Sequence, residues 1–338
     1  MEKVHDTTKQ EEQELWRKSI PAQVFLNHFF GIHRHIAHQQ AQHSIADLGT
    51  FKSFAPELSQ EQKEQAKKML IQCWNTEYAL RTTAANGDES YLKNALHWTF
   101  PQAYYCLLFG AKAFLAAQGA TVMSENAVRL RLARLVTSGW YPLPVSFAAF
   151  GSPGHYSYRA LPEGYRTPNL ELVDSPKESQ AQVGQFLRTT RTLQVRALRR
   201  RLQDNPATAQ INKQTGQPLA KFSRKHWDVV ARALGATTFF DLFSRLKISA
   251  NHREIGRFVE AEIDVRLFHR SLLETVVYLN TIHEAYVAKA LGKNAYQFFL
   301  DQLPGYLRKG FVQKRFEEEI RPLLTEVRSI DSSLQWAS

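Results

Sequence analysis

The sequence predicts an all-α protein, a bundle of many helices interrupted by an irregular segment rich in proline and aromatic residues. Three observations support this class. Apolar residues recur every three or four positions through most of the chain, as in amphipathic helices. Residues that cap helices stand where several of these patterns begin. Glycine or proline stands where several of them end.

Length and composition set the frame. The 338 residues suffice for one elaborate helical domain or two modest ones. The 43% hydrophobic content suits a soluble protein, and no apolar run approaches the length of a membrane span. The first residues are charged and polar, which argues against a secretory signal. Cys73 and Cys106 have no motif spacing, so we expect buried, reduced thiols in a cytoplasmic protein without a membrane partner.

We expect three regions along the chain. Residues 1–150 form an N-terminal helical region. Residues 151–181 form a Pro/Gly-rich segment that is ordered but irregular or contains short strands, because its aromatic content argues against a floppy linker. Residues 182–338 hold a basic helix and a C-terminal helical region with a long closing helix.

A first helix is expected around residues 12–42, and it is rich in histidine. A helical metal pair needs ligands three or four positions apart on one face, and only His35 with His38 meets that spacing, without a nearby carboxylate or cysteine. We therefore expect a solvated histidine-rich face and no metal. The histidines are His28, His33, His35, His38 and His43. Nucleotide-binding loops and zinc knuckles do not occur either, so no cofactor is expected.

Two further helices follow in the N-terminal region. One begins after Ser59, because Gln62 completes a capping box, and it ends at the Asn-Gly-Asp turn of residues 86–88. The next begins near residue 100 and runs for about 18 residues to Gly119, a natural C-cap. It is apolar on most sides, so neighbouring helices should cover it.

Positive charge is concentrated in the second half of the chain. Between Arg188 and Lys225 there are ten basic residues and one acidic residue, Asp204, in a chain whose net charge is +11. A helix expected from about 182 to 203 places arginines beside an apolar arc. Such a positive field attracts polyanions, which favours nucleic acid, RNA or DNA, as the partner. The candidate binding residues are Arg188, Arg191, Arg196, Arg199, Arg200, Arg201, Arg224 and Lys225.

The region after the basic helix alternates loops and helices. Residues 204–220 are nearly free of large apolar side chains and should form a mobile loop. Ser223 then caps a helix that ends at Gly235, and a short helix follows from Thr237 or Thr238.

A long helix closes the pattern. Its apolar stripe runs from Phe258 to Tyr286, and Asn251 is a plausible N-cap, so we expect one helix that begins at or beside His252. Short helices are expected near 294–302, 311–320 and 322–330.

Two stretches resemble a known family. The residues Tyr104-Tyr105, Phe109, Ala111-Lys112-Ala113 and Gly119 resemble the central helix of HEPN domains, which are small all-helical domains of toxins, CRISPR-associated ribonucleases and other defence proteins. Arg245 and His252, separated by six residues, are similar to the arginine–histidine motif of that family. The resemblance covers residues 92–119 and 238–291.

The resemblance implies a fold and two of the three functions that the sequence leaves open; the third, the scaffold, follows from the basic helix alone. The fold would be a HEPN-like helical core, and the chain would be a nucleic-acid-binding subunit or effector of a prokaryotic defence or toxin-type system, with self-association as a homodimer or assembly with a partner protein. In a first alternative the chain is a metal-independent endoribonuclease, in which Arg245 stabilises charge on the scissile phosphate and His252 is the general acid or base. In a second alternative it is an interaction scaffold whose arginines meet an acidic protein.

Overall fold

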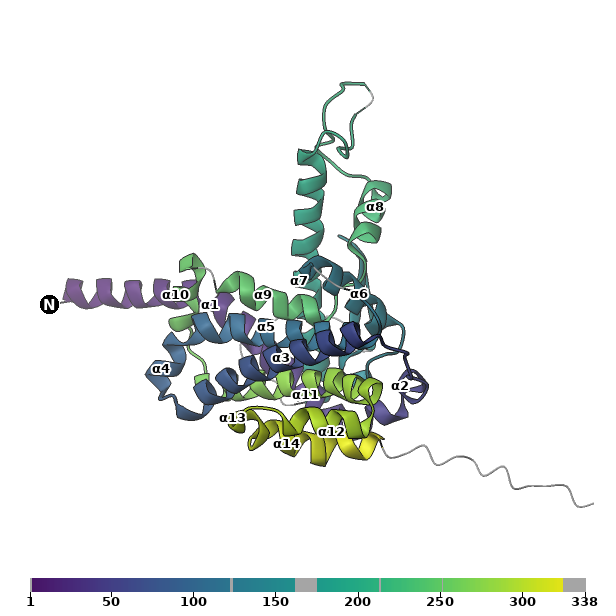
Figure 1. The fold of residues 1–338 in the computed structure, drawn as a ribbon. Helices are drawn as coiled ribbons and strands as arrows, with labels where there is room; N and C mark the ends of the chain where they lie inside the picture. Colours follow the sequence, from purple (N-terminus) through teal and green to yellow (C-terminus); the bar gives the residue numbers. More distant parts are fainter. Residues whose placement is uncertain (1, 122–123, 162–174, 213, 251, 325–338) are drawn as a thin grey trace, which may run out of the picture.

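The computed structural model describes residues 2–121, 124–161, 175–212, 214–250 and 252–324, with the backbone alone for 2–19 and 252–254. The described residues form a bundle of helices, as the sequence predicted, and they also contain one small antiparallel hairpin (Figure 1). The elements of the N-terminal half are α1 (Glu2–Gln39), α2 (Gly49–Lys52), α3 (Gln60–Asn86), α4 (Glu89–Asn94), α5 (Leu96–Ala117), α6 (Glu125–Thr137), β1 (Ala148–Ser152) and β2 (His155–Arg159). Those of the C-terminal half are α7 (Pro176–Asp204), α8 (Arg224–Leu234), α9 (Phe239–Ser249), α10 (His252–Val259), α11 (Val265–Leu291), α12 (Lys293–Asp301), α13 (Gly305–Arg308) and α14 (Phe311–Arg315).

Helices α3, α5 and α11 run side by side through the centre of the body (Figure 1). Helix α5 is buried over most of its surface, as its apolar sequence predicted. One hydrophobic core takes in residues from Ala22 in α1 to Ile320 near the end of the described chain. The N-terminal and C-terminal regions that the sequence divides therefore pack on one another.

Capping residues set several helix boundaries as expected. Ser59 and Gln62 form the capping box that starts α3, with the Gln62 amide 3.2 Å from the Ser59 hydroxyl. Gly119 and Gly235 follow α5 and α8 and have φ angles of 77° and 74°, where a side chain would be strained. These three predictions are confirmed.

The prediction of one long closing helix is wrong, because two helices occupy this stretch. Helix α10 ends at Val259, and α11 begins separately at Val265, where the Asp264 carboxylate accepts a hydrogen bond from the Leu267 amide at 2.8 Å. Phe258 before the break, Ala261 within it and Val265 after it are all buried, so the apolar stripe continues although the helix does not. Asn251, the expected N-cap, lies outside the described residues.

The segment expected to be irregular or to contain short strands overlaps a short hairpin, which begins at Ala148. Strands β1 and β2 pair antiparallel, with Ala148 opposite Arg159 and Ser152 opposite His155. An additional bridge joins Ala149 to Thr237, at the turn before α9. The hairpin therefore connects the body to the region that carries the basic residues.

The histidine-rich face of α1 is not wholly solvated. His28 and His35 are 3% and 1% exposed, and His33 lies 2.6 Å from the Glu274 carboxylate. The described residues contain no group of three or more His, Cys, Asp or Glu side chains that could hold a metal ion. Burial, together with the nearby charge of Arg245, lowers the pKa of His28 to about 3. His28 is therefore a neutral core residue that bonds Gln182 at 2.9 Å.

Cys73 and Cys106 are buried free thiols, as predicted, with their sulfur atoms 3.9 Å apart. In the part of the chain that the structure describes, no helix combines the length and the hydropathy that a membrane span needs.

A buried ionic cluster joins α14 to the bundle. The Arg315 guanidinium contacts the carboxylates of Glu77 in α3 and Glu284 in α11, and all three side chains are at most 3% exposed. Trp74 and Tyr296 also donate to Glu284, at 3.0 and 2.7 Å. Because each buried oxygen has a donor, the cluster fixes where the C-terminal helices dock.

Candidate nucleic-acid interface

Helix α7 has two halves with different surroundings. Its N-terminal half is packed in the body against α1, where residues 181–187 are all buried. Its C-terminal half stands away from the body and pairs with α8, so that residues 195–234 form a projecting helical hairpin (Figure 1). We call residues 195–234 the basic arm. Helix α7 begins earlier than predicted, because Ser175 and Glu178 form a capping box ahead of Pro176.

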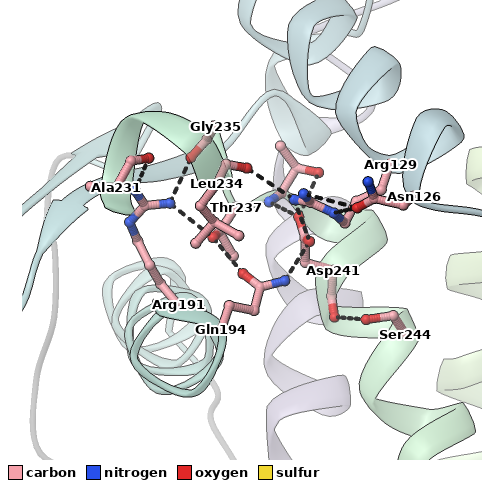
Figure 2. Close-up of polar contacts among 11 residues, drawn as sticks. Asn126, Arg129, Arg191, Gln194, Ala231, Leu234, Gly235, Thr237, Asp241 and Ser244 are labelled. Atoms are coloured by element: carbon pink, nitrogen blue, oxygen red, sulfur yellow. Dashed lines mark hydrogen bonds and ion pairs between the residues drawn. The ribbon is translucent and has the colours of Figure 1, made fainter. Parts of the chain in front are cut away.

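One arginine fixes the base of the arm. Arg191 is 1% exposed, and its guanidinium donates to the Gly235 carbonyl oxygen at 2.8 Å and to the Thr237 hydroxyl at 3.1 Å (Figure 2). It also donates to the Gly151 carbonyl oxygen at 2.8 Å. Burial lowers the pKa of Arg191 to about 10, so the group stays cationic at neutral pH. Arg191, which the sequence groups with the candidate binding residues, is thus enclosed and does not face a polymer at the surface.

A chain of polar contacts continues from Arg191 into the body. The Thr237 hydroxyl donates to the Gln194 side chain at 2.8 Å, and Gln194 donates to the Asp241 carboxylate at 2.6 Å. Arg129 of α6 lies 3.5 Å from the same carboxylate, and it also donates to the Leu234 carbonyl at 3.2 Å (Figure 2). The arm is therefore braced to α6 and α9 rather than attached by a loose linker.

The arm has a small hydrophobic core of its own. Val195, Val230 and Leu234 are buried between α7 and α8, and Trp227 packs against them. Arg199 lies over this core, with its guanidinium 4.7 Å from the Phe222 ring centroid. It also donates to the Ala220 carbonyl at 2.5 Å. Arg199 thus closes the side of the arm and offers only part of its surface to a partner.

The remaining arm cations are exposed. Arg196, Arg200 and Arg201 on α7 form no ion pair or hydrogen bond with any described residue through their side chains, and neither do Lys221, Arg224 and Lys225. Asp204 and Asp228, the two carboxylates between residues 195 and 234, pair with none of them. Unpaired guanidinium and ammonium groups on a projecting surface can contact phosphate oxygens, and arginine can do so with two hydrogen bonds.

Arg188 stands below the arm and is exposed. Its guanidinium lies 5.9 Å from the Tyr156 ring of the hairpin. It therefore extends the positive surface of the arm toward β2.

The tip of the arm is a hydrogen-bonded loop. Ile211 bridges Pro218 in antiparallel fashion, and Gln203 in the last turn of α7 bonds both Gln210 and Leu219. The sequence predicted a mobile loop here because large apolar residues are few. The described part of the loop is closed by backbone and amide hydrogen bonds, and its mobility stays a prediction.

Of the two residues proposed for catalysis, only Arg245 has a side chain that the structure describes. Arg245 is half-buried in α9, donates to the hydroxyls of Thr189 and Thr190 at 3.2 and 3.3 Å, and lies 5.1 Å from the ring centroids of Phe25 and Phe186. Its guanidinium thus connects α1, α7 and α9. The side chain of His252 lies outside what the structure describes, so the pair stays a prediction.

Sequence reasoning missed the polar residues that hold the arm. Gln194 and Asp241 had no role in the prediction, although Asp241 is buried and its pKa is raised by that burial. The sequence does indicate that Arg191 is buried, because it lies four residues after Leu187 and four before Val195 and therefore shares their buried arc.

No protein-family model, curated protein or solved structure matches this chain.

Proposed function

We propose that this chain binds nucleic acid, RNA or DNA, through the basic arm, with the phosphate backbone as the main point of contact. The observation that carries the proposal is the set of exposed arm cations without acidic partners, on a hairpin that projects from the body (Figure 1). Contacts of this kind are electrostatic and largely independent of base sequence.

The bracing of the arm supports this function. A cationic surface held by Arg191 and Gln194 loses little conformational freedom when it binds, because its base is already fixed in the free protein. The exposed arginines lie on one helix, at positions 196, 200 and 201, so several phosphates of one polymer can be contacted together.

Fluorescence anisotropy with labelled single-stranded RNA and duplex DNA tests the proposal. The arm variant is Arg196→Gln with Arg200→Gln and Arg201→Gln. Each lost phosphate contact lowers the slope of log K against log salt by about 0.7 to 0.9, so the slope should fall by about two or more units. Binding that ignores both salt and these substitutions would contradict the proposal.

A matched control removes the same charge elsewhere. Lys52, Arg270 and Lys309 are exposed on the body, and their side chains have no partner among the described residues. Lys52→Gln with Arg270→Gln and Lys309→Gln lowers the net charge by the same three units. We expect this control to bind nearly as the unmodified chain does. An equal loss in both triple variants would mean that net charge alone, and not the arm, attracts the polymer.

The two alternatives give different results in the same assays. Cleavage of labelled RNA in EDTA that is lost in His252→Ala would assign a metal-independent ribonuclease. The engaged donors of Arg245 favour a binding role instead. A failure of both polymers to bind at low salt, with capture of a polyglutamate chain that requires Arg196 and Arg200, would assign a scaffold for an acidic protein.

A further inference from the structure

A surface pocket of about 510 Å³ lies away from the basic arm, where α6 meets the segments after α2 and α5. Its size falls within the range of about 300–1,000 Å³ that is usual for small-molecule sites. The residues that line it include Phe54, Gln118, Arg131, Arg134, Leu135 and Trp140. None of them belongs to the arm, so this site is independent of the proposed nucleic-acid contact.

The apolar wall of the pocket is rigid. The Trp140 ring lies 5.7 Å from that of Phe54 and 5.5 Å from that of Tyr286. Its backbone is also fixed, because the Trp140 amide donates to the Leu135 carbonyl at 3.1 Å and its carbonyl accepts from the Tyr286 hydroxyl at 2.9 Å. Phe54 is 7% exposed, whereas Trp140 is only partly buried and so leaves part of its ring open to the pocket. A flat apolar body can pack here without rearranging the wall.

The polar groups of the pocket are donors. Arg131 and Arg134 lie three residues apart on α6, both are exposed, and neither side chain has a partner among the described residues. Gln118 adds a buried amide nitrogen that donates to no described acceptor. None of the described lining residues carries a carboxylate. Arg129 on the same helix, by contrast, is paired with Asp241.

These features define the ligand by charge and shape. Two guanidinium groups supply a charge of +2, which matches a phosphate monoester of about −1.5 to −2 at neutral pH. Arginine also binds phosphate oxygens with two hydrogen bonds, and an indole face can stack on a nucleobase. We propose that the pocket between α6 and Trp140 binds a nucleoside monophosphate unit, with the phosphate on Arg131 and Arg134 and the base against Trp140.

Isothermal titration calorimetry on the full chain tests the site with adenosine 5′-monophosphate, adenosine and inorganic phosphate as probes. The nucleotide should bind more tightly than either fragment, because only the nucleotide has both the anion and the flat body. Arg131→Gln with Arg134→Gln should weaken nucleotide binding by about tenfold or more, since charge-assisted hydrogen bonds are lost. Arg196→Gln with Arg200→Gln on the arm should leave that affinity unchanged.

A second variant keeps the test independent of folding. Trp140→Leu should bring nucleotide affinity down toward that of inorganic phosphate, with thermal unfolding recorded for each variant to confirm that it is folded. Equal affinity for the nucleotide and for inorganic phosphate would overturn the proposal, as would nucleotide binding that ignores both arginine substitutions or the absence of nucleotide binding. Equally tight binding of phosphotyrosine would overturn the assignment of the base.

The nucleoside monophosphate unit has two possible sources, a free nucleotide and the 5′-phosphorylated end of a nucleic-acid strand. A chain that carries the three arm substitutions is titrated with a short RNA that has either a 5′-phosphate or a 5′-hydroxyl. Binding that requires the 5′-phosphate and Arg131 supports the proposal with a strand end as the source. Binding of the mononucleotide alone supports it with a free nucleotide as the source.

Discussion

Arg191 donates to the carbonyl oxygen of Gly235 at 2.8 Å, although 44 positions separate the two residues. This hydrogen bond ties the middle of α7 to the turn that ends α8, so it sets where the basic arm leaves the body (Figure 2). Removal of the guanidinium would leave the half-buried carbonyls of Gly151 and Gly235 without this donor. We expect Arg191→Ala to lower the free energy of unfolding by about 2–4 kcal/mol. Urea denaturation would measure the change.

Arg196→Ala on the same helix is the matched control for this prediction. Arg196 is exposed and has no partner among the described residues, so its loss should change stability by less than about 0.5 kcal/mol. Nucleic-acid binding should show the opposite order. At a temperature where both variants are folded, Arg196→Ala should weaken binding more than Arg191→Ala does. Equal stabilities of the two variants would show that the Arg191 contacts do not hold the arm.

The same comparison shows what the sequence could predict. Local signals work where the cause is local, so the capping box of Ser59 and the glycine after α8 gave correct boundaries. The break between α10 and α11 escaped because Phe258 and Ala261 stay buried across it, and periodicity reports burial rather than hydrogen bonding. The candidate interface was predicted from a local concentration of positive charge, which the sequence itself reveals.

The division of that charge into structural and exposed arginines was not predicted. Arg191 and Arg196 have the same chemistry, and only the position of Arg191 in line with Leu187 and Val195 separates them. The partners of Arg191 lie in the hairpin and in the turn before α9, 40 or more positions away. Contacts at that separation depend on the tertiary fold, so sequence periodicity does not reveal them.

Acid should destabilise the protein through His28. Burial, aided by the positive charge of Arg245, lowers the pKa of His28 to about 3 in the folded chain, against about 6.5 when unfolded. The unfolded chain therefore takes up a proton that the folded chain refuses between these values. The stability due to the neutral ring is present above pH 6.5 and is lost as the pH falls toward 3. From pH 7 to pH 5 this one group should remove about 2 kcal/mol.

Comparison with His28→Gln isolates that contribution. The variant should be less stable at pH 7, because it removes the imidazole ring, whose centroid lies 4.6 Å from that of the stacked Phe186 ring. Its deficit relative to the unmodified chain should shrink by about 2 kcal/mol at pH 5, since glutamine does not titrate. Urea denaturation at the two pH values measures this. An unchanged deficit would mean that His28 is protonated in the folded state near its ordinary pKa.

The buried ionic cluster should depend on its single buried cation. Arg315→Leu keeps the apolar bulk but leaves the carboxylates of Glu77 and Glu284 buried with less compensation. We expect a loss of about 3–5 kcal/mol in the free energy of unfolding at pH 7. Lys314→Leu is the control, because its side chain is 72% exposed. Arg81 also donates to the Glu77 carboxylate, at 2.9 Å. A loss that is no larger than the control's would show that solvent or Arg81 compensates the carboxylates.

The pH dependence of Arg315→Leu gives a second measure. Burial already raises the pKa of Glu284 in the intact cluster, and removal of the cation should raise it further. The folded variant should therefore take up a proton at a pH where the unfolded chain does not. Its stability relative to the unmodified chain should recover as the pH falls from 7 toward 5. A deficit that grows in acid would contradict this account.

Gly110 should be needed because α5 and α11 approach each other closely at this point. A β-carbon at residue 110 would lie 2.6 Å from the Asn280 side-chain oxygen and 3.2 Å from the Nδ1 atom of His283. Both side chains are buried in α11, so they cannot move aside into solvent. Gly110→Ala should lower the free energy of unfolding by about 1–3 kcal/mol, although alanine is the better helix former.

Gly256→Ala in α10 is the control for this contact. A β-carbon there meets nothing within 4 Å, so alanine should stabilise the helix by about 0.5–1 kcal/mol. The two substitutions are chemically identical, and their opposite signs in thermal or urea denaturation would separate helix propensity from helix packing. A stabilising Gly110→Ala would mean that α5 and α11 can separate by a few tenths of an ångström without loss of stability. The close approach of the two helices would then not constrain the bundle.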